Sequence, residues 1–285
     1  MRLFLLPLML WAAAVEGAAP REPEVEVGVG AVVLVTPDYR GSSEYGWRVL
    51  PIPYVSYRTD RVQITRQGVR ARLLSLDRTS LTVSGATSLP GSGDNRLRSL
   101  RTPTARPMTA IDPTFEFGPA IDYRLYEASD GMARTLVRVP LRAVVSVDDF
   151  HFHGRGLTLS PHVLHSFWQV HDGWELSQHL SAGPLFASED YHDYYYGVAR
   201  RYAIPGVRPE YRTRAGYSGF RATTSSGIHF GDWRVGVFAS FDWLRGAVFE
   251  DSPLIERDHS MTAGAYVSYR FYRSVAQRPV GDETQ

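Results

Sequence analysis

The chain has 285 residues, 44% of them hydrophobic, and a formal net charge of +1. This composition excludes an intrinsically disordered protein and leaves room for one large or two ordinary domains. All 31 residues in the Lys+Arg count are Arg, and 30 acidic residues oppose them, so the chain lacks the basic excess of a protein that binds nucleic acid. Cysteine is absent, which fits an exported protein.

The first 19 residues, MRLFLLPLMLWAAAVEGAA, have the composition of a secretory signal peptide. Arg2 supplies a basic start, residues 3–14 form an apolar core, and small residues continue to Ala19. The apolar run is short for a helix that spans a bilayer. We therefore expect export, with cleavage of residues 1–19 and a mature chain that begins near residue 20.

Beyond residue 20, apolar and polar residues alternate with the period of two that is typical of β-strands. The alternation opens at Val25 and is clearest over residues 115–125, 135–147, 233–243 and 261–271. The last of these segments lies in SMTAGAYVSYRF, which places six apolar side chains on one face and is longer than a typical soluble strand. Charged residues occupy the opposite faces, which suits a polar interior.

About a dozen such segments in an exported chain are typical of an outer-membrane barrel that is apolar outside and polar inside. A closed barrel is also the only strand structure that a bilayer permits. We therefore predict an all-β fold, a transmembrane antiparallel up-and-down β-barrel over residues 20–271, located in the outer membrane and in contact with its lipid. The alternative is a secreted β-sandwich or a soluble lipocalin-like barrel, with the apolar faces turned inward.

Turn chemistry predicts the topology of this barrel. Short connections alternate with long polar ones, and barrels of this class keep the short turns and both termini in the periplasm. Short turns lie near residues 59–60, 77–78, 129–131, 171–173 and 230–232, and long gaps near 36–46, 89–110, 188–210 and 247–259. Splitting the segment 62–75 at Gln67 and Gly68 gives twelve strands, whereas leaving it whole gives ten; we expect twelve.

One hairpin allows an inference about the lumen. A three-residue turn that ends in Gly131 would pair Ala128 with Met132. Counting back from that pair places Asp122 directly opposite Arg138, with both side chains directed inward. We predict a lumen ion pair between these two residues; charges that are separately solvated by lumen water are the alternative.

Candidate catalytic and metal-binding residues are few. His151 and His153 lie two apart on one strand face, a spacing that could serve a metal, but no carboxylate motif accompanies them. His165 and Ser166 are adjacent in a strand and point to opposite faces, so they cannot act simply as base and nucleophile. We therefore predict a protein that is not an enzyme, without catalytic, cofactor-binding or metal-binding residues; a lipid hydrolase is the enzymatic alternative.

A long gap between two strands is rich in arginine. Arg96, Arg98, Arg101 and Arg106 lie in a loop that the predicted topology places outside the cell. Guanidinium groups bind phosphate in a fork geometry, so this loop could contact phosphate groups of lipopolysaccharide. A solvated loop is the alternative.

Three stretches resemble the MipA/OmpV family of outer-membrane proteins, and they occur in order between about residues 25 and 271. They are TPDYRGSSEYGWRVLPIPYVSYR at 36–58, DYYYGV at 193–198, and GDWRV at 231–235 followed by EDSPLIE at 250–256. The residues that carry the resemblance in the loops are Tyr39, Gly41, Ser42, Tyr195, Tyr196, Gly197, Val198, Ser252 and Pro253.

The resemblance implies an outer-membrane β-barrel with no catalytic or metal residues. The family is named for a member described as a scaffold that binds a lytic murein transglycosylase and a bifunctional murein (peptidoglycan) synthase. Other members are linked to adhesion, osmotic response and antibiotic susceptibility. A non-enzymatic scaffold that docks murein enzymes is therefore the expected function, and a narrow porin-like channel or a surface adhesion and stress-response protein is the alternative.

The C-terminus departs from the usual pattern of this class. Outer-membrane barrels commonly end on an aromatic residue, and Phe271 would be the aromatic of the closing strand. Fourteen residues follow it. We expect residues 272–285 to form a polar tail outside the barrel.

Overall fold

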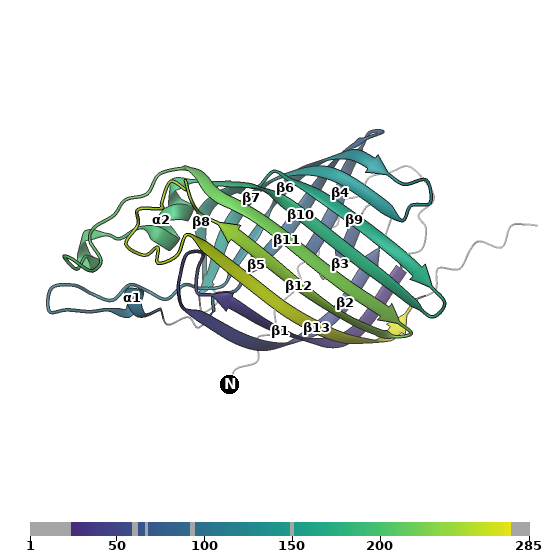
Figure 1. The fold of residues 1–285 in the computed structure, drawn as a ribbon, viewed down its shortest axis with the longest axis horizontal. Helices are drawn as coiled ribbons and strands as arrows, with labels where there is room; N and C mark the ends of the chain where they lie inside the picture. The colour runs from purple at the N-terminus through teal and green to yellow at the C-terminus, as the bar shows by residue number, and fades with distance from the viewer. Residues whose placement is uncertain (1–23, 59–61, 66–67, 92–94, 149–150, 275–285) are drawn as a thin grey trace, which may run out of the picture.

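The computed structural model describes residues 24–58, 62–65, 68–91, 95–148 and 151–274, which form one antiparallel sheet that closes into a barrel (Figure 1). The expected signal peptide and most of the expected tail lie outside the described residues. The strand segments in chain order are β1 (Glu24–Pro37), β2 (Tyr45–Arg58), β3 (Val62–Thr65), β4 (Gly68–Ser75), β5 (Thr79–Ser88), β6 (Thr114–Glu127), β7 (Ala133–Asp148), β8 (His151–Leu159), β9 (His162–His171), β10 (Trp174–Ala187), β11 (Gly216–Phe230), β12 (Trp233–Trp243) and β13 (His259–Arg273).

The described segments make twelve barrel strands. Segments β8 and β9 follow one another along the same neighbour, because Leu159 pairs with Leu141 of β7 and His162 pairs with Arg138 of β7. Pro161 stands between them, and a proline has no N–H to donate to the ladder. The separate segments β3 and β4 confirm the expected division of residues 62–75 and exclude the ten-strand alternative.

The hairpin between β6 and β7 differs from its prediction. The N–H of Ala128 donates to the carbonyl of Ala133 at 2.8 Å, so Ala128 faces Ala133 and the expected pairing with Met132 is wrong. The turn has one residue more than expected. A bulge at Leu125 shifts the register by one residue, and this shift restores the predicted pairing farther along the two strands.

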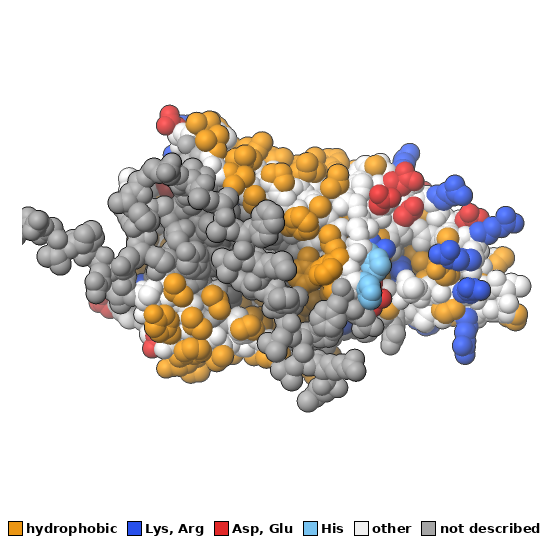
Figure 2. All heavy atoms as spheres, turned by 180° about the vertical axis from the view of Figure 1, so that it is seen from behind, with side chains coloured by type: hydrophobic (Ala, Val, Ile, Leu, Met, Phe, Trp, Pro, Cys, Tyr) orange, Lys and Arg blue, Asp and Glu red, His pale blue; other side chains and the backbone are white. Residues whose placement is uncertain are grey.

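The apolar faces of the strands point outward. On β13, Met261 is 51% exposed and Phe271 is 60% exposed, whereas Ser260 and Ser268 on the opposite face are buried. Where grey atoms do not cover the wall, Figure 2 shows hydrophobic side chains spread over it, and most of the visible arginine side chains lie at one end. This arrangement is that of a membrane barrel and excludes the lipocalin-like alternative, whose apolar face would line the interior. Among the described helices, none has the length and apolar character needed to cross a membrane.

The first and last strands close the barrel through backbone pairing of β1 with β13. On the inner face of this seam, the carboxylate of Glu26 accepts from Arg234 of β12 at 2.7 Å and from Arg270 of β13 at 2.6 Å. The side chain of Glu26 is 4% exposed. Strand β13 continues to Arg273, two residues beyond the outward-facing Phe271.

We predict that Glu26→Gln lowers the free energy of unfolding in detergent by about 3–5 kcal/mol, because two lumen guanidinium groups lose the buried carboxylate that they share and Arg270 keeps only its pair with the exposed Asp232. The measurement is unfolding in denaturant, with the folded fraction monitored by the heat-dependent mobility shift on a gel. The control is Glu127→Gln, which removes the exposed pair with Arg124 and should cost about 1 kcal/mol or less. Equal losses in the two variants would contradict the role given to Glu26.

Candidate functional site

The long connections meet at the barrel end opposite the short turns (Figure 1). The described parts of these four connections, residues 38–44, 89–91 with 95–113, 188–215 and 244–258, are called the loop cap here. They contain α1 (Arg96–Ser99), α2 (Glu189–Tyr196) and the 3-10 helix η1 (Arg200–Tyr202). The predicted topology places this end outside the cell.

The loop cap has a hydrophobic core of its own. Within this core the rings of Tyr196 and Phe249 stack with centroids 3.7 Å apart. Both side chains are almost completely buried. The core consists of Tyr39, Ile111, Tyr195, Tyr196, Val198, Leu244, Ala247, Phe249 and Leu254. All four connections contribute, so the cap assembles only when segments far apart in the sequence come together.

The residues that carry the family resemblance gather in this loop cap. The hydroxyl of Tyr39 donates to the carbonyl of Leu254 at 2.8 Å, and the hydroxyl of Ser252 donates to the carbonyl of Tyr196 at 2.7 Å. Each bond joins two different connections. Tyr195 and Val198 lie in the core, and Pro253 is half-buried between Ser252 and Leu254. These contacts hold the loops together, and none of them presents a reactive group.

The first connection is fixed by two small residues. Gly41 has φ +93°, and a Cβ there would lie 2.5 Å from Cδ1 of Ile255, so glycine suits this position on both conformational and steric grounds. Its carbonyl accepts the N–H of Glu256 at 2.8 Å. Ser42 is fully buried and accepts from the side-chain amide of Asn95 at 3.1 Å. The connection is thereby tied to two others.

Gly197 follows the last residue of α2 and lets the chain pass close to the backbone of Asp193. A Cβ at Gly197 would lie 2.8 Å from the carbonyl oxygen of Asp193, the same oxygen that accepts the Gly197 N–H at 3.1 Å. The carboxylate of Asp193 in turn accepts from the hydroxyl of Thr213 at 2.6 Å. The helix is therefore anchored to the chain that leads into β11.

Arg208 is the polar centre of the loop cap. Its side chain is completely buried, and burial lowers its pKa from the ordinary value, although a guanidinium keeps its charge near neutral pH. The group donates to five backbone carbonyls, which belong to Leu97, Arg98, Leu100, Arg106 and Tyr202. Four of these carbonyls lie in one connection and the fifth lies in η1. The guanidinium of Arg208 therefore joins residues 95–113 of the loop cap to residues 188–215.

Arg98 is not the exposed phosphate contact that the sequence indicated. It is buried, and its guanidinium donates to the carbonyls of Tyr195 and Thr109. The short helix α1 turns this side chain inward, where burial lowers its pKa. Arg96, Arg101 and Arg106 are exposed, as that interpretation requires.

His192 is a buried titratable group in the loop cap that the sequence analysis did not single out. Its Nδ1 lies 2.7 Å from the carbonyl oxygen of Arg214, and its Nε2 is buried without a partner among the described residues. Its ring packs 4.9 Å from that of Phe249. Burial lowers the pKa of His192, so the neutral form is the one that fits the core.

Ion pairs line the barrel interior. Asp122 lies opposite Arg138, and the two form a bidentate pair with both contacts at 2.6 Å. Farther toward the loop cap, Arg142 lies 3.7 Å from Glu116. At the cap itself, Asp242 accepts from Arg221 at 2.9 Å and lies 3.0 Å from Arg40. Each pair joins neighbouring strands or a strand and a loop.

The interior also contains a serine and a histidine in contact. Ser166 Oγ lies 2.8 Å from Nδ1 of His179, whereas His165 contacts the hydroxyl of Thr135 at 2.9 Å. Sequence analysis considered His165 as the neighbour of Ser166 and missed His179, because that contact crosses from β9 to β10. His151 and His153 are exposed on β8. Within the described ranges, no group of three or more His, Cys, Asp or Glu residues could hold a metal ion.

The model of one protein family matches residues 29–271, and its description is "MltA-interacting protein MipA". No curated protein has a significant sequence match to the chain. Among solved structures, the outer membrane protease OmpT of Escherichia coli is 9% identical, with 90% of this chain and 99% of that chain covered and a TM-score of 0.31. The outer membrane channel DcaP of Acinetobacter baumannii is 9% identical, with 87% and 96% covered and a TM-score of 0.33. Similarities this low carry no argument about activity.

We predict that Arg208→Lys loosens the loop cap without opening the barrel. Lysine has three donors and no fork, so at least two charge-assisted hydrogen bonds are lost, each worth about 1.5–3 kcal/mol. Trypsin cleavage within the cap should accelerate at least about tenfold, while the heat-dependent gel shift stays unchanged. The control is Arg212→Lys, whose parent side chain is 88% exposed; both changes preserve a trypsin site. Cleavage rates equal to the wild type in Arg208→Lys would contradict the prediction.

Proposed function

We propose that this chain, which belongs to the MipA family, is a non-enzymatic scaffold that docks a lytic murein transglycosylase, and with it a murein synthase, at the turn end of the barrel. The observation that carries the proposal is the loop cap. It covers one mouth of the barrel with a packed core, so the opposite end is left as the surface for a partner. Fold alone does not decide function, and the family supplies the class of partner.

The family description and the topology support this proposal together. The description names an interaction with MltA, and its model spans residues 29–271. Barrels of this class keep their short turns in the periplasm, the compartment that contains murein. We also propose export through a signal peptide over residues 1–19 and a polar tail that begins after Arg273, where β13 ends, two residues later than the sequence predicted.

A second proposal concerns the outer surface. Arg106 donates its N–H to the carbonyl of Arg201 at 3.0 Å, which brings two arginine-rich connections side by side. Arg101, Arg106, Arg200 and Arg201 are all exposed there. Such a surface suits phosphate groups of lipopolysaccharide. It therefore supports the alternative function, that of a protein that acts in adhesion or stress response at the cell surface.

A porin-like channel is the competing function for the barrel itself. The loop cap and the ion pairs of the lumen favour a barrel that does not conduct. In planar bilayers the wild-type protein should therefore be silent. Reproducible single-channel steps would favour the channel.

The docking test uses the full chain in nanodiscs and the soluble domain of the lytic transglycosylase from the same cell. Binding at a Kd of about 10 µM or tighter is expected, because a periplasmic scaffold must hold its partner specifically. Reversing charges on two short turns, with Asp77→Arg and Asp130→Arg together, should weaken binding at least about tenfold. The matched control is Asp251→Arg in the loop cap. Absence of binding, or equal weakening by the control, would contradict docking at the turn end.

A further inference from the structure

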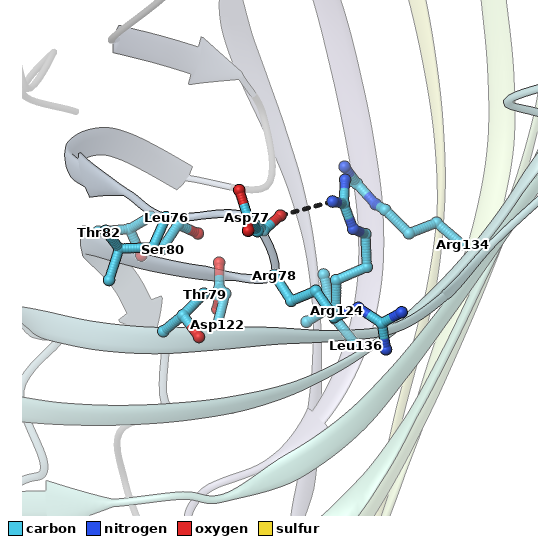
Figure 3. Close-up of a pocket in the computed structure, with 10 residues that line it drawn as sticks. All are labelled: Leu76, Asp77, Arg78, Thr79, Ser80, Thr82, Asp122, Arg124, Arg134 and Leu136. Atoms are coloured by element: carbon cyan, nitrogen blue, oxygen red, sulfur yellow. Dashed lines mark hydrogen bonds between the residues drawn. The ribbon is translucent and has the colours of Figure 1, made fainter.

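A small cavity lies at the turn end of the barrel, inside the wall formed by β5, β6 and β7 (Figure 3). Its volume is about 120 Å³, roughly four times the share of one water molecule in the liquid. Three guanidinium groups line it, from Arg78, Arg124 and Arg134, together with the hydroxyl groups of Ser80 and Thr82. This cavity is called the turn-end pocket here.

The acidic residues around the turn-end pocket pair with Arg138 and Arg124, and none of the described ion pairs involves Arg134 or Arg78. Asp122 is held by Arg138 through two contacts of 2.6 Å. Glu127 accepts from Arg124 at 2.6 Å, and the same guanidinium donates to the backbone carbonyl of Asp77 at 2.6 Å. The carboxylate of Asp77 belongs to an exposed residue of the turn between β4 and β5. The inner part of the pocket therefore keeps a positive charge.

Arg134 is the unsatisfied group of this pocket. Its Nε is buried and has no hydrogen-bond partner among the described residues. In Figure 3 its side chain reaches from β7 toward the turn that carries Asp77. Arg78 stands on that turn and is exposed, and its guanidinium forms no hydrogen bond or ion pair within the described part of the chain. Buried polar groups in folded proteins nearly always have partners, so the buried and unpartnered Nε of this half-buried arginine, Arg134, which lines the pocket, indicates an acceptor that binds there.

We propose that the turn-end pocket binds an oxyanion, the carboxylate or phosphate group of a small ligand, between the guanidinium groups of Arg134 and Arg78. A guanidinium fork matches two oxygens of either group in a bidentate arrangement. Ser80 also lines the pocket and carries a hydroxyl donor. The pocket has room for the charged group and opens at the end of the barrel where the short turns lie. This site is independent of the scaffold proposal.

The experiment is isothermal titration of the full chain in detergent with inorganic phosphate and, separately, with acetate at matched ionic strength. Saturable binding of at least one probe with one site per chain is expected. Arg134→Gln should raise the Kd at least about tenfold. Arg134→Lys keeps the charge but loses the fork, so it should also weaken binding. Binding of phosphate alone identifies a phosphate ligand, and binding of acetate identifies a carboxylate ligand.

Two further variants keep the test decisive. Arg78→Gln changes an exposed turn residue, so the barrel wall stays intact. It should weaken binding because it removes one of the two proposed guanidinium ligands. This variant therefore tests the proposal even if Arg134→Gln assembles poorly. Arg212→Gln in the loop cap removes an equal charge at the other end and should bind as the wild type does. The proposal is overturned if neither probe binds at about 10 mM, or if the Arg78 and Arg212 variants bind equally well. The heat-dependent gel shift verifies that each variant is folded.

Discussion

The pairing of β1 with β13 is the contact on which the other features depend. Within a bilayer every backbone N–H and C=O must find a partner in the protein, and a sheet of this kind meets that demand only when its first strand joins its last. The alternating sequence follows from the same constraint, since lipid surrounds the outer face and polar side chains fill the inner one. Glu26 adds an interaction inside the seam, where one carboxylate serves arginines of β12 and β13.

Closure of the barrel also determines where the loops lie. Strands that run up and down bring connections distant in sequence to one rim, and the side chains of the four described cap segments bury one another there. Arg208 shows how such an assembly is stabilised without a dedicated carboxylate, because five carbonyls of two connections share its charge. The same closure places Arg134 and the turn at Asp77 beside one cavity at the opposite end. The two ends therefore differ in kind: one is packed and the other keeps unsatisfied cations.

The sequence predicted what depends on local periodicity. Outward-facing residues of β13, the division of residues 62–75 and the register of Asp122 with Arg138 all follow from alternation and from counting along strands. Features that depend on tertiary contacts were not predictable in this way. The turn after Ala128 is one residue longer than predicted, and the bulge at Leu125 shifts the pairing back by one residue. The predicted register of Asp122 with Arg138 was therefore correct, although the predicted turn was wrong. Arg98 was expected in solvent and is buried, because only the folded loops supply its carbonyl acceptors.

The most direct test of the account is a disulfide across the seam. The chain has no cysteine, so Val33→Cys with Ala265→Cys introduces one defined pair on residues that face each other in β1 and β13. Paired Cα atoms in antiparallel strands lie about 4.5–5.5 Å apart, within disulfide reach. The account predicts that mild oxidation of outer membranes links the pair within one chain, and that Val33→Cys with Thr135→Cys, on β1 and β7, does not link. Failure of the seam pair to link, or linkage only between chains, would contradict a barrel closed by β1 and β13.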